Sequence, residues 1–515
     1  MKKRALISVF DKAGIIDFSD KLVKLDFEIV STGGTYKLLK SNNIPVKSVE
    51  EITNFPEVLD GRVKTLNPNI FSGILAIKNN TKHLEEIKKH NLLLFDLVVV
   101  SLYPFEETLK KPDSKPEDII EMIDIGGVSL IRAAAKNYEH TTVLTSENQY
   151  KEFIDIYMDN GNKIPVEYSK YAAYLSFAEI AKYDIAIQNY FKSINILNKY
   201  CSETSEVPEF ITLDNPYHLR YGENPHQYAV LFRNGFDDIF AVLHGKELSY
   251  NNLLDVDAAL NIINDFESEP PTCAIIKHGN PSGIATAEEL KTSYLKAFET
   301  DTVSPFGGII IFNKKLDLET TIEADKIFTE IILAPDYEEE ALNLLKQKKN
   351  RRLLKYKFVK NDFLFRSITG GILKQENDSI IFNKSDLKCV TDSKPDDKIM
   401  KDFEFAYKIV KHTKSNAIVF IKDLQTLGIG AGQPSRVDST KLAVSKAKQF
   451  GLNLKDSVVA SDAFFPFPDG IVEIANAGGK FIIQPGGSVR DNEVLETANK
   501  LGLCMVFTGI RHFRH

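Results

Sequence analysis

The chain has 515 residues, of which 43% are hydrophobic and 26% charged, and its net charge at neutral pH is −7. At about 150 residues per domain, this length predicts three or four domains with real cores, and the acidic balance excludes an overall basic field that would recruit nucleic acid. No apolar run approaches the ~20 residues that span a membrane, and no signal peptide opens the chain. We therefore expect a cytoplasmic protein with no nucleic-acid or membrane partner.

Cysteine and histidine usage gives no metal pattern. The four cysteines stand singly, at Cys201, Cys273, Cys389 and Cys504. Their spacing fits neither a zinc site nor a disulfide framework. The histidines are dispersed as well, apart from His512 and His515 at the tail. The sequence predicts no protein-bound transition metal.

The first part of the chain alternates short apolar strands with helices. Residues 5–9 and 27–31 are predicted strands; between them, Ile15, Phe18, Leu22 and Leu25 mark one face of a helix. STGGT (31–35) follows, with a second helix expected from near Tyr36. A strand, a Gly-Gly turn and a helix present backbone N–H groups to a phosphate, although a tight turn with a threonine cap is an equal alternative. The motif is neither GxGxxG nor a Walker loop, so it does not indicate dinucleotide or ATP binding.

Three further junctions carry polar groups. They are GRVKTLNP (61–68), the strand 97–101 running into Tyr103, and IDIGG (123–127) before a helix that carries Lys136. If 61–68 is extended, Arg62 and Lys64 lie on one side of it. In an open parallel sheet, ligands bind outside the carboxyl ends of the strands. Together these junctions predict a phosphate-ester pocket.

A long helix and a polar linker are expected next. The helix spans about 166–200 and carries an aromatic stripe that we interpret as core or subunit interface: Tyr171, Tyr174, Phe177, Tyr183, Tyr190 and Phe191. Residues 201–216 are rich in Ser, Thr, Glu and Pro without an apolar period, which predicts a domain linker.

The second half contains the segment AIIKHGNPSG (274–283). Its apolar residues predict the end of a buried strand, and Gly279 to Gly283 form a turn signal. Neighbours in a strand point to opposite faces, so only a turning chain aims both Lys277 and His278 at one pocket. A base that titrates near neutral pH beside a fixed cation suits proton transfer. The alternative is a solvated Lys277 with His278 capping a turn.

Other segments of the second half continue the alternation of strands, turns and helices that is typical of an α/β fold. LRYGENPHQ (219–227) is a donor-rich loop, 303–312 a Gly-Gly turn feeding a buried strand, and 334–350 an acidic turn entering a helix with a basic end. Residues 350–400 are expected to be irregular and to mark a subdomain boundary. Strands with glycine turns then recur to the end of the chain.

The motifs taken together resemble one family. GRVKTLNP, SLYPF, IDIGG, AAAKN, RYGENPHQ, IIKHGNPSG, FGGIIIFN, GIGAGQPSRVDS, SDAFFPFPDG, QPGGS and RHFRH occur in that family's order. Over nearly its whole length, the chain is similar to the bacterial form of the bifunctional purine-biosynthesis family that joins AICAR transformylase to IMP cyclohydrolase.

The resemblance implies an α/β fold with a methylglyoxal-synthase-like cyclohydrolase domain at 1–200, the linker 201–216, and a transformylase region at 217–515. That region would hold two cytidine-deaminase-like subdomains with a break near 350–400, but without the metal, since the zinc-binding motifs of true deaminases are absent. The resemblance also implies an intertwined homodimer with shared transformylase sites. It implies 10-formyltetrahydrofolate as co-substrate, and it allows a structural monovalent cation such as K+.

By the same resemblance, the transformylase moves a formyl group from 10-formyltetrahydrofolate to the weakly nucleophilic 5-amino group of AICAR, giving FAICAR. His278 matches the family's base, Lys277 its cation and Asn416 an orienting residue. AICAR would be held by Arg220, Tyr221, Gly307, Glu330, Arg436, Arg511 and Phe513. The folate side would be lined by Val437, Phe464, Asp469 and Ser488. Of Phe464, Phe465 and Phe467, we expect at least one to be simple core.

The cyclohydrolase would close FAICAR to IMP with loss of water, which requires orientation and electrostatic stabilisation. Lys64, Lys136, Tyr103 and Asp124 match its catalytic set. Its nucleotide cradle would be Phe10, Asp11, Lys12, Thr32, Gly33, Gly34, Thr35, Arg62, Val63, Lys64, Thr65, Ser101 and Leu102.

The chain departs from the family pattern at Asn67, Phe71 and Ser101, all beside the expected cyclohydrolase pocket. A transformylase with a weakened cyclohydrolase is therefore one alternative to the two-step enzyme. A non-catalytic nucleotide sensor is another. The joint presence of Lys277, His278, Lys64 and Lys136 argues against the sensor, because a sensor needs no proton-transfer pair.

Overall fold

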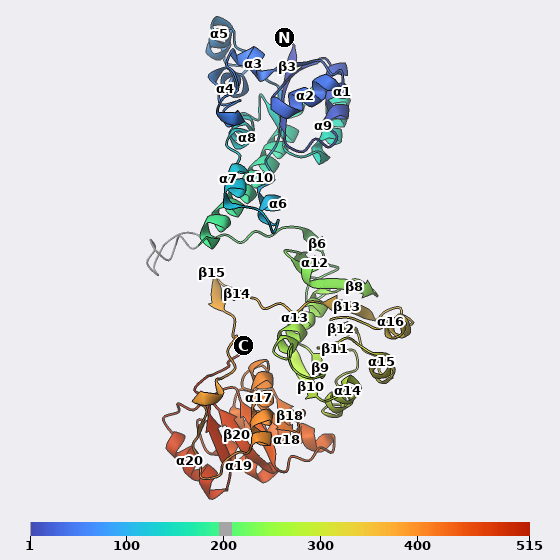
Figure 1. The fold of residues 1–515 in the computed structure, drawn as a ribbon, viewed down its shortest axis with the longest axis vertical. Coiled ribbons are helices and arrows are strands. Elements are labelled where there is room, and N and C mark those ends of the chain that lie inside the picture. Colours follow the sequence, from blue (N-terminus) through green and yellow to red (C-terminus); the bar gives the residue numbers. More distant parts are fainter. Residues whose placement is uncertain (1, 195–208) are drawn as a thin grey trace. The chain divides into compact units, whose positions relative to one another are not determined.

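The computed structural model describes residues 2–194 and 209–515 and divides into two compact units, Met1–Thr212 and Leu213–His515 (Figure 1). The division falls inside the predicted linker 201–216. Of that linker, 201–208 lie outside the described residues, as do Cys201 and the end of the predicted helix, 195–200; residues 209–215 form neither helix nor strand.

The first unit is a five-stranded parallel sheet in the order β3-β2-β1-β4-β5. Its strands are β1 (Lys3–Val9), β2 (Phe27–Ser31), β3 (Val46–Ser48), β4 (Leu97–Ser101) and β5 (Thr142–Leu144). Its helices are α1 (Ile15–Lys24), α2 (Gly33–Ser41), α3 (Val49–Thr53), the 3-10 turn η1 (Leu59–Gly61), α4 (Pro68–Leu75), α5 (Thr81–Lys89), α6 (Phe105–Leu109), α7 (Pro116–Glu121), α8 (Gly126–Lys136), α9 (Asn148–Asp159) and α10 (Val166–Ser193). The strand order reverses direction between β1 and β4, which is where ligands bind in such sheets.

Alternation along the strands explains the layers of this unit. Ala5, Ile7 and Val9 of β1 pack with α1, α2 and α9 on one face, while Leu6 packs with α4, α8 and α10 on the other. Buried on both faces, the strands read as continuous apolar runs, as in other parallel sheets. α2 begins at Gly33, earlier than the expected Tyr36, so STGGT supplies the helix's own first turn.

The aromatic stripe of α10 divides into two sets. Tyr183 and Tyr190 pack against Phe105 in a small core, as expected. The others are exposed, at Tyr171, Tyr174, Phe177 and Phe191. For that second set, the expectation of core is wrong, and the alternative of a subunit interface stays a prediction.

The second unit is built on a twelve-stranded sheet in the order β16-β21-β20-β19-β17-β18-β10-β9-β11-β12-β13-β8. Its strands are β8 (Phe240–His244), β9 (Thr272–Lys277), β10 (Asn280–Thr286), β11 (Ile309–Phe312), β12 (Ile331–Ala334), β13 (Arg352–Tyr356), β16 (Lys388–Cys389), β17 (Ile418–Lys422), β18 (Gln425–Gly430), β19 (Ser457–Ser461), β20 (Gly479–Gln484) and β21 (Cys504–Phe507). Two hairpins stand outside this sheet: β6 (Pro216–His218) with β7 (Val230–Phe232), and β14 (Phe363–Ile368) with β15 (Gly371–Glu376).

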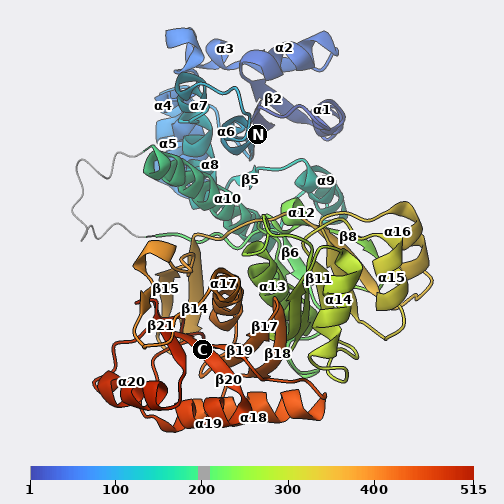
Figure 2. The same ribbon diagram turned by 60° about the horizontal axis from the view of Figure 1, so that its bottom comes forward.

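The helices of this unit are α12 (Phe236–Ile239), α13 (Tyr250–Asn264), α14 (Leu290–Glu299), α15 (Leu318–Ala324), α16 (Glu339–Leu345), the 3-10 turn η2 (Lys384–Asp386), α17 (Asp397–Lys411), α18 (Arg436–Gln449), α19 (Asp469–Ala477) and α20 (Asp491–Lys500). α13 and α17 share one apolar core on one face of the sheet. The opposite face is covered by α14 to α16 over one half and α18 to α20 over the other (Figure 2).

The two halves of this sheet repeat one arrangement. Each runs helix, antiparallel hairpin, helix, strand and two further parallel strands, and the halves meet where β10 pairs with β18. α13 and α17 occupy equivalent places and are both 15 residues long. This repeat fits two α/β subdomains.

Two expectations fail in part. Residues 350–400 are not simply irregular, because β13, the β14–β15 hairpin and β16 fall there. Helix α16 ends at Leu345, so the basic residues expected at its end follow the helix instead.

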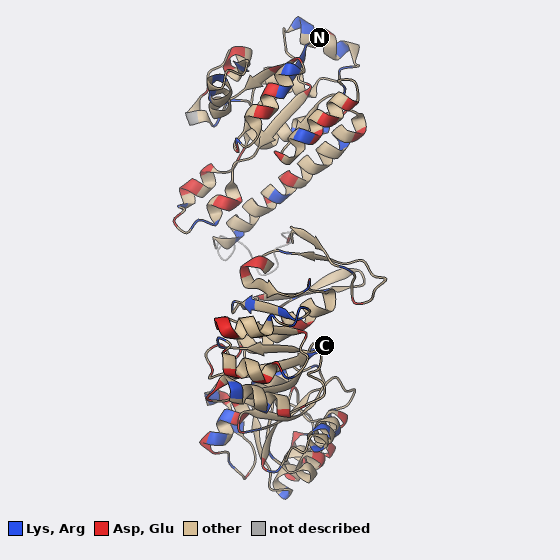
Figure 3. Cartoon of the chain, turned by 90° about the vertical axis from the view of Figure 1, so that its right-hand side faces the viewer, with Lys and Arg blue, Asp and Glu red and all other residues tan. Residues whose placement is uncertain are grey.

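Charges are mixed along both units, with Lys and Arg interspersed among Asp and Glu (Figure 3). Within the described ranges, no helix is both long and apolar enough to cross a membrane. The same residues contain no group of three or more His, Cys, Asp or Glu arranged to hold a metal ion.

Candidate active sites

The first unit holds a cavity of about 640 Å³ at the carboxyl ends of β1, β2 and β4. Most of the predicted nucleotide cradle lines it: Phe10, Lys12, Thr32, Gly33, Gly34, Thr35, Arg62, Lys64, Thr65 and Ser101, with Tyr103 and Asp124 of the predicted catalytic set. Asp11, Val63 and Leu102 are neighbours in sequence of these residues but do not line it.

Two lysines enter this cavity from different loops. The Lys12 ammonium donates to Thr35 Oγ1 at 3.0 Å and to the Val9 carbonyl, and burial lowers its pKa, with nearby Lys64 acting in the same direction. Lys64 pairs with Glu57 at 3.1 Å. Two cations held against a helix N-terminus suit a phosphate group.

Gly33, the first residue of α2, lies beside the ammonium of Lys64. Gly33 has a φ of +42°, which favours glycine, and a Cβ there would lie 3.4 Å from Lys64 Nζ. The positive φ therefore accounts for the glycine, while a Cβ there would make an ordinary contact with the flexible end of Lys64.

Asp124 stands at the start of α8, facing the same cavity. Burial raises the pKa of its carboxyl, while the backbone N–H groups of Gly127 and Tyr103 and the charge of Lys64 act to lower it. Gly127 N donates to Asp124 Oδ1 at 2.6 Å, and Asp124 N donates to the Tyr183 hydroxyl at 2.9 Å. Tyr183 thus fixes this loop from α10, a role that its place in an aromatic stripe did not reveal.

The segment 61–68 is not extended. The expectation that Arg62 and Lys64 lie on one side of it depended on an extended backbone, so that condition is not met. The segment follows η1, and Arg62 has helical backbone angles. Both side chains reach the cavity even so, and Arg62 pairs with Glu121.

Lys136 does not lie with the other predicted catalytic residues at the cavity of the first unit. It is the exposed last residue of α8, about 15 Å along the helix from Gly126 at 1.5 Å per residue. It does not line the cavity. Its catalytic role stays a prediction that the geometry of this unit does not support.

The three departures from the family pattern have structural roles. Ser101 Oγ accepts from Phe10 N at 2.7 Å and from Asp11 N at 3.1 Å, so it holds the loop after β1. The Asn67 side chain caps α4 by accepting from Asn69 N at 2.9 Å, and Phe71 packs against the core. None of the three blocks the cavity.

The second candidate site is centred on the β9–β10 hairpin. Its turn consists of His278 and Gly279, with φ of 51° and 71°, as in the two-residue type I′ turn that matches strand twist. The expected turn over Gly279 to Gly283 is therefore wrong in extent, since β10 begins at Asn280. His278 is exposed at the tip.

Lys277 points to the loop before β11. Its ammonium donates to the Phe306 carbonyl at 2.6 Å, and a Cβ on Gly307 would lie 3.6 Å from it. Glu330 N donates to the Gly308 carbonyl at 3.0 Å, and the Glu330 carboxylate pairs with Arg352 at 3.0 Å. The Gly307 and Glu330 segments therefore lie together beside Lys277.

The other half of the sheet brings Asn416 to the same side. Lys414 N donates to Asn280 Oδ1 at 3.1 Å, which joins this segment to the hairpin. Asn416 Nδ2 donates to the carbonyls of Gln433 and Pro434 at 2.9 and 3.1 Å.

Arg436, at the start of α18, is buried and already bonded within the protein. Its Nη2 donates to Asp462 at 2.6 Å and its Nε to Ser461 at 2.7 Å. Two of its nitrogens are thus committed to the protein, which leaves it less free to hold AICAR than expected.

The carboxyl-terminal segment lies beside Asn416. Arg514 N donates to Ser415 Oγ at 3.0 Å, and Ser415 N donates to the Arg514 carbonyl at 2.9 Å. Arg511 lies over the Phe513 ring at 4.4 Å. Arg220 lies over Tyr221 at 5.5 Å in an exposed loop, and among the described residues no hydrogen bond or ion pair joins these two to the hairpin.

The predicted folate residues come from loops of the second half. Asp469 opens α19, Ser488 N donates to Asp491, and Phe464 and Val437 are half-buried. Phe465 is core, as expected for at least one of the three phenylalanines. A cavity of about 230 Å³ beside the hairpin is lined by Lys277 but by none of these four.

Comparisons with known proteins cover the chain from end to end. The model of the AICARFT/IMPCHase bienzyme family matches residues 134–446, and that of the MGS-like domain matches 14–129. Proteins named bifunctional purine biosynthesis protein PurH are 47% identical in Chlorobium phaeobacteroides (strain BS1), 48% in Chlorobaculum parvum and 45% in Caldicellulosiruptor bescii. Each alignment covers 100% of this chain and 99%, 99% and 100% of the relative.

These matches span both units, and they agree with the motifs and with an α/β unit that precedes a larger α/β region. The chain belongs to the bacterial bifunctional purine-biosynthesis family, with AICAR transformylase and IMP cyclohydrolase activities.

Proposed function

We propose that the two reactions use separate sites: the cavity of the first unit closes FAICAR to IMP, and the β9–β10 hairpin carries formyl transfer. The observation that carries the proposal is the placing of Lys277 and His278 at one tight turn, beside Gly307 and joined to the Asn416 segment. A sheet interior could not present both neighbours to one substrate.

In the transfer step, the AICAR amine attacks the formyl carbon of 10-formyltetrahydrofolate. His278 takes the proton that the amine loses, and the Lys277 ammonium faces the charge that develops on the formyl oxygen. The bond from the carbon to folate N10 then breaks, and N10 takes up a proton. General base catalysis supplies roughly 10²–10⁴-fold, so positioning and electrostatics supply the rest.

In the closing step, the carboxamide nitrogen of FAICAR attacks its own formyl carbon and the oxygen leaves as water. Lys12 and the α2 N-terminus would hold the phosphate. Lys64, Tyr103 and Asp124 would surround the reacting atoms. Their convergence on one cavity supports this assignment and supports an intact cyclohydrolase over a weakened one.

A homodimer with shared transformylase sites is part of the proposal. The β14–β15 hairpin exposes large apolar side chains on both strands: Phe363, Leu364, Phe365, Ile372 and Leu373. Exposed apolar surface of this extent suits a protein interface. Arg220 and Arg511 lie outside the cavity beside the hairpin, which fits a site completed by a second copy.

The co-substrate of the transfer is proposed to be 10-formyltetrahydrofolate, and the compartment the cytosol. A structural K+ ion is part of the proposal without an assigned site.

The test supplies each substrate separately to the full chain. AICAR with 10-formyltetrahydrofolate should give FAICAR and then IMP, followed by ultraviolet absorbance, and FAICAR alone should give IMP. A nucleotide sensor would bind AICAR without turnover.

Lys64→Ala should abolish closure of FAICAR while formyl transfer continues, because Lys64 belongs only to the first cavity. Lys136→Ala is the matched control, and its exposed place off the cavity predicts a much smaller loss of closure. Equal loss of closure and transfer in Lys64→Ala would indicate misfolding. If Lys136→Ala loses closure but keeps formyl transfer, Lys136 takes part in closure after all.

A further inference from the structure

A carboxylate on α13 holds the turn that carries His278. Asp255 is half-buried, and its Oδ1 accepts a hydrogen bond from Gly279 N at 2.6 Å. The two residues are 24 positions apart, and only the packing of α13 against the sheet brings them together. A short bond from a carboxylate to a backbone N–H is among the stronger hydrogen bonds in a protein.

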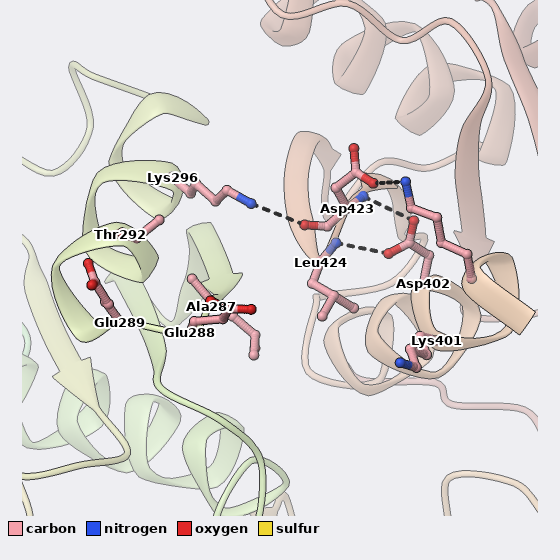
Figure 4. A pocket seen from close by; sticks show the side chains of 11 residues that line it. Ala287, Glu288, Glu289, Thr292, Lys296, Lys401, Asp402, Asp423 and Leu424 are labelled. Atoms are coloured by element: carbon pink, nitrogen blue, oxygen red, sulfur yellow. Dashed lines mark hydrogen bonds and ion pairs between the residues drawn. The ribbon is translucent and has the colours of Figure 1, made fainter.

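The other half of the sheet provides a comparison. Asp402 is the sixth residue of α17, as Asp255 is of α13, and it holds the turn of the β17–β18 hairpin. Its two oxygens accept from Asp423 N at 3.0 Å and from Leu424 N at 2.8 Å (Figure 4). Both carboxylate oxygens of Asp402 therefore accept hydrogen bonds from the backbone of the turn.

Asp255, by contrast, holds its turn through one carboxylate oxygen, Oδ1. In the described ranges its Oδ2 accepts no hydrogen bond, although the charges of His278, Lys277 and Glu330 all act on the carboxyl. Burial raises the pKa of Asp255, and His278 and Lys277 act to lower it. The unused oxygen thus lies in the electrostatic surroundings of the proposed base.

We propose that Asp255 is the positioning residue of His278: one carboxylate oxygen fixes the turn, and the other accepts the N–H of the imidazole during turnover. The bond would hold the imidazole in the tautomer whose free nitrogen faces the AICAR amine. The carboxylate would also stabilise the imidazolium that forms when His278 takes the proton. This inference rests on the proposed role of His278 as base.

The test is the pH profile of formyl transfer in Asp255→Asn, which keeps the shape of the side chain and an acceptor for Gly279 N. We expect kcat to fall about 10-fold or more with little change in the KM for AICAR. The apparent pKa of the acidic limb should fall by about one unit, because the imidazolium loses its anionic partner. Asp255→Glu should restore part of kcat.

The matched control is Asp402→Asn, the same change at the equivalent position of the other half, which should leave the pH profile unchanged. If the apparent pKa of the acidic limb in Asp255→Asn equals that of the wild type, the inference is overturned, even if kcat is lower. A merely structural role for Asp255 would lower the rate without shifting that apparent pKa. If Asp255→Asn does not fold, Asp255→Ser, which also removes the negative charge, carries the same measurement of the acidic limb.

A double variant separates this inference from the proposed function. With His278→Ala present, Asp255→Asn should cause no further loss of transfer. If His278→Ala itself retains transfer, the proposed base is wrong. If His278→Ala is inactive and Asp255→Asn behaves as wild type, only the positioning role fails.

Discussion

The two halves of the second unit use the same scaffold at equivalent hairpins. In each, a helix aspartate holds a two-residue turn with positive φ, and the strand pairing shifts by one residue at the same distance from the turn. In each, a glycine of the second strand lies against a helix carbonyl, Gly283 against Ala297 and Gly428 against Ala443. Packing dictates these features, so they recur without regard to chemistry.

The tips of the two hairpins differ. Lys277, His278 and Gly279 stand where the other half has Lys422, Asp423 and Leu424. Asp423 pairs with Lys398 at 2.5 Å. The Lys296 ammonium donates to the Asp423 carbonyl (Figure 4). Lys422 donates to the Lys455 carbonyl at 2.8 Å. The second tip therefore uses its polar groups within the protein, while the first leaves an exposed imidazole. The difference supports the proposal that formyl transfer uses the first of these two equivalent turns.

The largest expected effect is at the first tip. His278→Ala should reduce formyl transfer by roughly 10²-fold or more, because no general base remains. Closure of FAICAR should continue, since we propose that it uses the cavity of the first unit. Both rates are followed by ultraviolet absorbance with AICAR and with FAICAR as starting substrate.

Asp423→Ala is the control at the second tip. It removes the Lys398 ion pair but no proposed catalytic group, so transfer should stay within about 3-fold of wild type, since an exposed pair contributes little. A loss equal to that of His278→Ala would mean that the tips are not functionally distinct.

The two close glycine contacts should respond alike to substitution. A Cβ on Gly283 would lie 1.9 Å from the Ala297 carbonyl oxygen, and one on Gly428 2.4 Å from that of Ala443. Gly283→Ala and Gly428→Ala should each lower the free energy of unfolding by about 1–3 kcal/mol, with the larger loss at Gly283. Urea unfolding followed by circular dichroism measures both. A neutral result at either position would contradict the shared packing requirement.

Local pattern was enough to predict the strands at 5–9, 27–31 and 97–101, because apolar runs bounded by glycine and charge mark buried parallel strands. It also led to the chain segments of both sites. The motifs named the family, which the full-length relatives confirm.

Contacts between distant segments were not predictable in this way. Asp255 is one of several acidic residues in a helical pattern, and nothing in its spacing points to Gly279. Tyr183 belonged to an aromatic stripe whose members look alike in sequence, yet its hydroxyl holds the Asp124 loop. Lys136 shows the converse limit: its motif follows IDIGG closely in sequence, while helix α8 carries it away from the cavity, so its catalytic role stays a prediction.

The smallest predicted effect concerns a bond between the halves themselves. Asp265 and His412 are the equivalent residues that directly follow α13 and α17, and His412 Nε2 lies 2.7 Å from Asp265 Oδ2. Burial lowers the pKa of His412 to about 4, although Asp265 acts to raise it. Burial also acts to raise the pKa of Asp265, but His412 and Lys411 outweigh it and lower that pKa to about 2.

Because of both pKa shifts, the free energy of unfolding decreases as the pH falls. The unfolded chain binds a proton at His412 below a pH of about 6.5, whereas the folded protein does so only near pH 4, so stability contributed by this group falls as pH drops through that window. Asp265 adds a further loss below about pH 4. In His412→Gln, the decrease in unfolding free energy between pH 7 and 4.5 should shrink by on the order of 1–2 kcal/mol. Urea titrations of wild type and variant at these two pH values measure the difference, and parallel decreases would show that the bond between the halves is indifferent to protonation of this imidazole.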